Sequence, residues 1–132
     1  MSFAFTKLTP NLVVADVGRS IAFYRDVLGM TLTRTVPDEG PFVFASLDNG
    51  PVEIFLNALD AAVAEYPAFG QRPVGGTLTQ FIEVKNVRAM WEALQGKAPV
   101  IFPLEKKWYG VTEFAIADPD GYIITFAEME GA

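Results

Sequence analysis

The sequence predicts an α+β protein that contains two copies of one β-α-β-β-β module. A strand-like segment, a helix-like segment and three further strand-like segments occur in this order, and the order returns in the second half. Residues 14–17 align with 84–87 at an offset of 70, and residues 48–50 align with 119–121 at an offset of 71. Two copies of this length predict two packed modules rather than a solenoid.

The first module begins with a Leu- and Val-rich segment, residues 6–15, which is typical of a strand. Asp16 occupies the position of a helix N-cap, and Gly29 the position of a helix stop. Apolar residues between them follow one helical face at i, i+4, i+7 and i+11, namely Val17, Ile21, Tyr24 and Leu28. Further strands are expected over residues 30–36, 42–47 and 51–57.

The second module repeats this order after a connector at residues 59–76, which holds a short helix-like stretch and then several Pro and Gly residues. Asn86 takes the N-cap position and Gly96 the stop. Strands are expected over residues 77–84, 100–104, 112–117 and 122–128. We therefore expect one domain over residues 1–132, with module 1 at about 5–58 and module 2 at about 77–130.

The composition, 51% hydrophobic and 20% charged, is that of a globular chain. The sequence has no Cys and no His, which excludes disulfides, zinc–thiolate sites, cysteine nucleophiles and the Ser-His-Asp triad. The net charge of −6 repels a phosphate backbone, so we expect no nucleic-acid partner. Residues 1–16 lack a charged start followed by an apolar core, and no apolar run approaches a membrane span. The expected location is therefore the cytoplasm.

Three segments carry a resemblance to a known superfamily: residues 12–17, residues 20–29 with Phe-Tyr-Arg-Asp-Val-Leu-Gly, and residues 113–122 with Asp-Pro-Asp-Gly. With this separation inside the repeat, the chain resembles the vicinal-oxygen-chelate proteins, which include glyoxalase I, extradiol dioxygenases and bleomycin-resistance proteins. Residues 108–114 resemble the bleomycin-resistance-like branch most. The resemblance implies curved mixed sheets around a cavity, and a homodimer.

The resemblance also implies a divalent metal held by His, Gln or Glu, and the corresponding positions fall at Thr9, Thr79 and Thr125. A neutral threonine hydroxyl is a poor donor to a transition metal. Glu53 is the carboxylate that remains in the first module's last strand, and it contributes only if a degenerate site exists. We therefore expect no metal and no other cofactor.

Strand alternation, with the register taken from the family, assigns seven residues to the cavity face: Asn11, Phe55, Thr79, Phe81, Glu83, Glu113 and Thr125. For Phe55 and Phe81, ordinary core packing is an equal alternative. Among the polar residues, Glu113 is the strongest candidate for a ligand contact, because a carboxylate facing an apolar cavity requires a partner or a ligand cation. Its alternative role is a salt bridge with Lys106 or Lys107, or a structural hydrogen bond.

Trp108 and Tyr109 lie in a loop at the mouth of the second module, where aromatic residues often contact ligands. A lid over the core or a dimer contact is the alternative. Asp118 and Asp120 belong to a turn and are interpreted as structural, because Asp side chains in such turns bond nearby backbone amides. Glu128 is expected on a solvated tail.

The first hypothesis is a metal-free, homodimeric protein that binds a small molecule, of the glyoxalase/bleomycin-resistance type. It would sequester a cationic aromatic compound or an antibiotic. The residues expected to bind the ligand are Asn11, Phe55, Thr79, Phe81, Trp108, Tyr109, Glu113 and Thr125. The second is a lyase, isomerase or dioxygenase-like enzyme with a non-standard metal site or with Glu113 as base. The third is a non-catalytic domain with a filled cavity.

Overall fold

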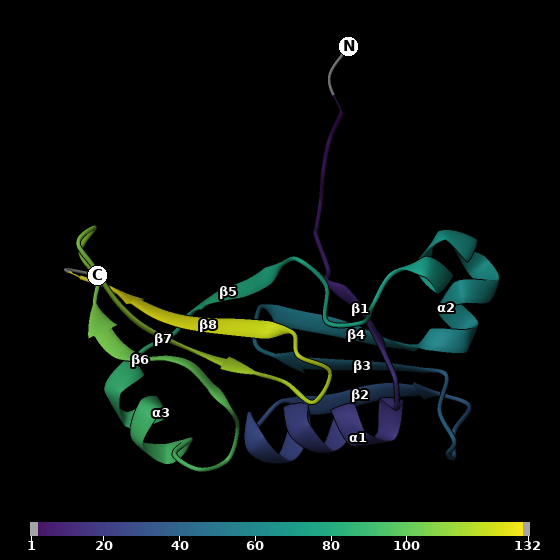
Figure 1. Cartoon of the computed structure of the whole chain (residues 1–132), viewed down its shortest axis with the longest axis horizontal. Coiled ribbons are helices and arrows are strands. Elements are labelled where there is room, and N and C mark those ends of the chain that lie inside the picture. The colour runs from purple at the N-terminus through teal and green to yellow at the C-terminus, as the bar shows by residue number, and fades with distance from the viewer. Residues whose placement is uncertain (1–2, 131–132) are drawn as a thin grey trace. The chain divides into compact units, whose positions relative to one another are not determined.

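The computed structural model describes residues 3–130, which form two compact units that divide between Pro67 and Ala68. Each unit holds one four-stranded mixed sheet with the strand order of a β-α-β-β-β module (Figure 1). The predicted α+β class and the internal repeat are confirmed. None of the helices in the described part of the chain combines the length and the apolar character that crossing a membrane requires.

The first unit has the sheet order β1-β4-β3-β2, in which β1 runs parallel to β4 and the other pairs are antiparallel. Its elements are β1 (Asn11–Val14), α1 (Val17–Ala22), a π-helical turn (Phe23–Val27), β2 (Thr31–Val36), β3 (Phe44–Asn49), β4 (Val52–Ala58) and α2 (Leu59–Glu65). A 3₁₀ helix (Pro67–Gln71) spans the division between the units.

The second unit repeats this topology with the order β5-β8-β7-β6, and here β5 runs parallel to β8. Its elements are β5 (Thr79–Glu83), α3 (Val87–Ala93), β6 (Val100–Lys106), β7 (Val111–Ala117) and β8 (Ile123–Met129). In both sheets the first and last strands of the module pair in parallel, which is the arrangement that a duplicated module predicts.

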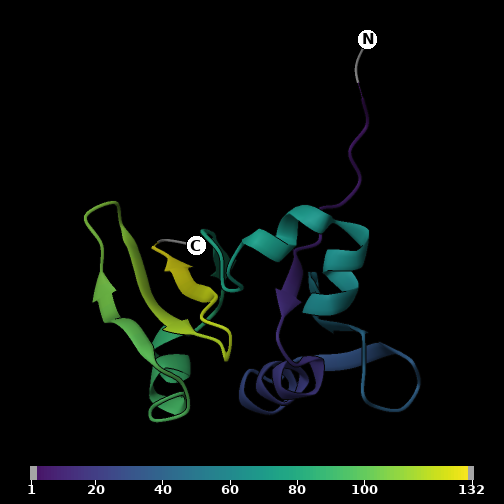
Figure 2. The same ribbon diagram turned by 45° about the vertical axis from the view of Figure 1, so that its right-hand side comes forward.

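The core of each unit lies between its sheet and the helix that follows its first strand. In the first unit, buried residues alternate along β4, where Ile54 and Leu56 face α1 and its buried Ile21. In the second unit the ring of Phe114 lies 5.3 Å from Trp91 of α3 and 5.3 Å from Phe126 of β8. Figures 1 and 2 show α3 against one side of this sheet. The opposite side of each sheet carries the alternate residues.

The first strand is shorter than residues 6–15, because β1 begins at Asn11. Pro10 has no amide hydrogen and cannot donate to a neighbouring strand. Its carbonyl oxygen accepts a hydrogen bond from Phe55 N at 2.9 Å, and the pairing of β1 with β4 starts there.

The first helix also departs from the expected continuous helix, since α1 passes into a π-helical turn at Phe23. Leu28 N donates to Phe23 O at 3.1 Å, one residue farther back than in an α-helix. Asp16 caps the start, as predicted, by accepting from Arg19 N at 3.0 Å, and Gly29 follows the end with φ of +76°.

Glu128 is not part of a solvated tail, because its carboxylate caps α3 from β8. It accepts from Asn86 N at 3.0 Å and from Val87 N at 3.1 Å, and these backbone amides lower the pKa of Glu128.

The Asp-Pro-Asp-Gly turn is structural as predicted: Asp118 accepts from the amides of Asp120 and Tyr122, both at 2.9 Å.

Candidate functional site

The side of the second sheet that faces away from α3 gathers most of the predicted ligand-binding residues. The register pairs Phe81 with Thr125, Thr79 with Ile123 and Glu113 with Ala127, and paired residues lie on one face. We call this surface the second open face because it lies opposite α3; Ala115, Thr125 and Ala127 on its inner strands are nevertheless buried. Its polar and aromatic members are Thr79, Phe81, Glu83, Glu113 and Thr125, together with Tyr109 of the β6–β7 turn.

Glu113 is a buried carboxyl group on the inner strand β7, near the β6–β7 turn, with 5% of its surface exposed. Tyr109 donates its phenol hydrogen to Glu113 Oε1 at 2.8 Å. Glu113 Oε2 is fully buried and lacks a hydrogen-bond partner, a state that no other side-chain oxygen or nitrogen shares within residues 3–130. A buried acceptor without a partner is costly, so this oxygen is a position where a ligand donor gains most.

The nearby lysines neutralise carboxylates other than Glu113. Lys106 pairs with Glu130 at 2.8 Å, and Lys107 pairs with Glu105, the cross-strand neighbour of Glu113. The hydrogen bond to Glu105 is the main reason that the pKa of Lys107 is raised. The hydrogen bond to Glu113 comes instead from a neutral phenol, so among residues 3–130 Glu113 has no ion-pair partner, and Lys107 acts on it only as a charge at longer range.

Trp108 and Tyr109 form an aromatic rim beside Glu113, in the turn between β6 and β7. Trp108 is 94% exposed and Tyr109 48% exposed, and their rings meet edge to face with centroids 5.2 Å apart. Lys107 N donates to Val111 O at 2.7 Å and closes the turn. Phe81, across the face on β5, is 50% exposed and therefore lies outside the core of this unit.

The residues at the family's metal-ligand positions do not fit a divalent metal. Thr79 Oγ1 and Thr125 Oγ1 are hydrogen-bonded to each other at 2.9 Å, which uses one hydroxyl hydrogen and one lone pair of the two groups. Thr9 adds another neutral hydroxyl in the first unit. Within residues 3–130, no three Asp, Glu, His or Cys side chains gather into a group that could hold a metal ion. Neutral hydroxyl oxygens alone bind such ions weakly.

The first sheet has a corresponding open face, on which Asn11 pairs in register with Phe55 and Phe55 with Ser46. Phe55 is half-buried, and its ring lies 5.2 Å from that of Phe44. Asn57 donates its side-chain amide to the Asn11 carbonyl oxygen. This hydrogen bond joins β1 to β4 through their side chains.

Glu53, the carboxylate of the first open face, already has partners of both kinds. Lys7 forms an ion pair with it, and Ser46 Oγ donates to it at 3.3 Å. The hydrogen bond from Lys7 is the main reason that the pKa of Glu53 is lowered. An ammonium group on this carboxylate opposes metal binding there.

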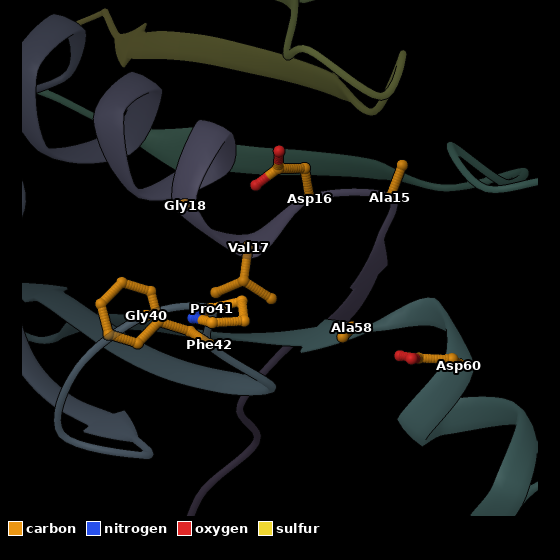
Figure 3. Close-up of a pocket in the computed structure, with 9 residues that line it drawn as sticks. All are labelled: Ala15, Asp16, Val17, Gly18, Gly40, Pro41, Phe42, Ala58 and Asp60. Atoms are coloured by element: carbon orange, nitrogen blue, oxygen red, sulfur yellow. The ribbon is translucent and has the colours of Figure 1, made fainter.

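The first unit also has a hollow of about 380 Å³ where β1 ends and α1 begins (Figure 3). Asp16 and Asp60 lie at its edge, and Phe42 lies among the apolar residues that line it. Both carboxylates bond to backbone amides at the starts of helices, Asp16 to Arg19 N at 3.0 Å and Asp60 to Ala61 N at 2.8 Å. The positions of the Asp16 and Asp60 side chains are therefore explained by hydrogen bonds to the first turns of these helices.

Some residues of the open faces have no counterpart among the sequence predictions. Asn57 shares the parity of Phe55 on the same strand, so alternation is a signal that identifies it. Lys7 lies before β1 but within the strand expected over residues 6–15, where it shares the parity of Asn11, so alternation is a signal for it as well. The hydrogen bond between Tyr109 and Glu113 joins a turn to a strand and follows from the hairpin geometry.

Two β-α-β-β-β modules, each with a mixed sheet backed by a helix, define the class to which this chain belongs. Residues 6–126 match the sequence model of the Glyoxalase/Bleomycin resistance protein/Dioxygenase superfamily. The chain belongs to this superfamily, as the resemblance in its motifs indicated.

Individual relatives agree with this assignment. The chain is 28% identical over 133 aligned residues to a protein named bleomycin resistance protein from Geobacillus stearothermophilus, with 91% of this chain and 94% of the relative covered. A glyoxalase/bleomycin resistance protein/dioxygenase from Nocardioides superposes with a TM-score of 0.79 at 21% identity, over 99% of this chain and 89% of that chain. The bleomycin-binding protein of Streptomyces verticillus, solved with copper(II)-bleomycin, gives 0.65 at 22% identity, over 99% and 100%.

Proposed function

We propose that this protein binds a small cationic aromatic compound on its second open face without a metal ion. The observation that carries the proposal is a buried Glu113 whose Oε2 has no hydrogen-bond partner, next to the exposed rings of Trp108 and Tyr109. An aromatic rim supplies stacking area and attracts a cation, and a carboxylate supplies the opposite charge.

Sequestration of an antibiotic is the use of this site that the relatives support. The curated relatives carry the name bleomycin resistance protein, and one structural neighbour was solved with copper(II)-bleomycin. Bleomycin is therefore the first compound to titrate, followed by simpler cationic aromatic compounds. Thr79, Phe81 and Thr125 are proposed as further contacts of the ligand on the second open face, and Asn11 and Phe55 are proposed separately as ligand contacts of the first open face.

The experiment that tests the proposal compares Trp108→Ala with Trp91→Ala by calorimetric titration and urea unfolding. Trp108 is an exposed turn residue, so its loss weakens binding by about 0.5–2 kcal/mol with little change in stability. Trp91 packs on Phe114, so its loss lowers the free energy of unfolding by about 2–4 kcal/mol with unchanged affinity per folded molecule.

Two results contradict the proposal. The first is that neither bleomycin nor any cationic aromatic compound binds the native protein. The second is that Trp108→Ala binds as tightly as the native protein.

The proposal that the site holds no metal ion is tested by elemental analysis. Purified protein is expected to contain less than stoichiometric Zn, Mn, Fe or Ni. One such ion per chain, retained after Glu53→Ala, would mean that the threonine positions have been misassigned.

Catalysis with Glu113 as a general base is the alternative function, because its hydrogen bond to Tyr109 places a second proton-carrying group beside it at 2.8 Å. The two functions differ in what happens to the bound compound. A binding protein releases the compound unchanged after prolonged incubation, whereas an enzyme converts it, and mass spectrometry distinguishes the outcomes.

A further inference from the structure

We infer that Glu113 selects ligands whose cation carries N–H donors, such as an amidinium, a guanidinium or a hydrogen-bearing ammonium, over quaternary ammonium ions. The inference rests on the proposed function and specifies the chemistry of the ligand at that same site. It follows from the two oxygens of one carboxylate, which have unequal surroundings.

The first step concerns hydrogen bonding. Oε1 of Glu113 accepts from Tyr109, while Oε2 is buried and has no partner. A quaternary ammonium ion supplies charge but no N–H, so it leaves Oε2 without a hydrogen bond. An amidinium or guanidinium supplies the charge and at least one directed donor, and charge-assisted hydrogen bonds of this kind are among the stronger ones.

The second step concerns charge. Glu105 and Glu113 are cross-strand neighbours, and Lys107 pairs with Glu105. Lys107 Nζ also lies 4.1 Å from the centroid of the Phe102 ring; its charge attracts Glu113 through space, but its hydrogen bond goes to Glu105. Two carboxylates share one ammonium group, so these three side chains carry a net charge of −1, and Glu113 is the carboxylate without a hydrogen-bonded cation. A ligand cation neutralises the negative charge that Glu105, Glu113 and Lys107 leave, whereas a ligand anion is repelled by it.

The third step is a comparison within the chain. Glu53, on the open face of the first sheet, is bound by Lys7 and by Ser46. Each carboxylate oxygen of Glu53 therefore has a donor from the protein itself. Glu113 has a donor for one oxygen only, and this difference assigns the selection of the ligand cation to the second sheet.

The fourth step concerns the aromatic rim. The rings of Trp108 and Tyr109 meet at 88°, an edge-to-face pair, and the phenol of Tyr109 is oriented by its bond to Glu113. A ligand ring that packs against this pair brings a directly attached amidinium close to Glu113. Benzamidinium has this shape, and phenyltrimethylammonium is its counterpart without N–H groups.

The test is a calorimetric titration of the full chain with these two probes. The native protein is expected to bind benzamidinium roughly tenfold to a hundredfold more tightly than phenyltrimethylammonium. Glu113→Gln should bring the two affinities within about threefold of each other, because the charge of the acceptor is lost. Glu92→Gln is the matched control: it removes the same charge from an exposed position of α3, outside the second open face, and the preference should persist.

Thermal unfolding of both variants, read beside the titrations, verifies that each is folded at the temperature used. Equal affinity for the two probes in the native protein, weakened equally by Trp108→Ala, would overturn the inference and leave the proposed function intact. A preference that survives Glu113→Gln would also overturn it. Binding of neither probe, with bleomycin still bound, would overturn the inference alone, whereas loss of all three would overturn both.

Discussion

Tyr109 and Glu113 form the hydrogen-bonded pair on which the proposed binding site depends. The phenol is anchored on a carboxylate that has no lysine partner of its own. The hydrogen bond to Glu113 raises the pKa of Tyr109, since ionising the phenol would place two negative groups side by side. The ring of Tyr109 is thereby held at the edge of the second open face, where Trp108 packs against it.

Replacement of Glu113 by Gln is therefore expected to lower the pKa of Tyr109 toward its ordinary value. The phenolate absorbance of the variant, followed against pH and corrected with Tyr109→Phe, measures this change. Tyr66 serves as an internal reference, because its pKa is raised mainly by a hydrogen bond to Glu65 and should not move. An unchanged Tyr109 titration would show that the two side chains are not bonded in solution.

At the scale of elements, the connector between the modules ends against the turn that joins β7 to β8. Gly75 has φ of +91°, and a Cβ added there would lie 2.4 Å from Asp120 O. Gly121, in the turn itself, has a nearly equal φ of +92° with no atom within 4 Å of the added Cβ. These two glycines share one backbone conformation and differ in their surroundings.

Alanine at the two positions separates backbone strain from steric contact. Gly121→Ala should lower the free energy of unfolding by about 1–2 kcal/mol, the cost of a left-handed residue with a side chain. Gly75→Ala should cost about 3 kcal/mol, because the Asp120 carbonyl must also move. Urea unfolding of both variants gives the comparison, and equal losses would contradict the close approach of the connector to this turn.

At the scale of the whole molecule, apolar side chains are exposed along both edge strands of the second sheet. Phe81 lies on β5, and Val100 and Ile101 lie on β6. Edge strands with exposed apolar residues favour association, and soluble chains rarely leave large apolar patches uncovered.

We therefore expect a homodimer in solution, the assembly that the family resemblance implies. Light scattering across micromolar concentrations is expected to give twice the chain mass. A single-chain mass throughout this range would contradict the expectation. Because Glu113 is buried within one sheet, Glu113→Gln should leave the measured mass unchanged.

Much of the architecture is determined by local patterns in the sequence. The offset of about 70 residues identifies the duplication, and Asp16, Asn86 and Gly29 mark helix boundaries through local backbone bonding. Period-two alternation assigns Glu113 and Thr125 to one face, because side chains alternate along any strand. These signals act within a few residues, so they can be read without a structure.

The partners of each carboxylate are decided by tertiary structure alone. Glu53 and Lys7 are 46 residues apart, and Glu128 reaches across 41 residues to cap α3. In the sequence Glu113 has Lys106 and Lys107 close by, yet its hydrogen bond comes from Tyr109, because the β6–β7 hairpin directs both lysines to other carboxylates. Which buried oxygen is left without a donor depends on how strands register, and a pattern of single residues does not contain that information.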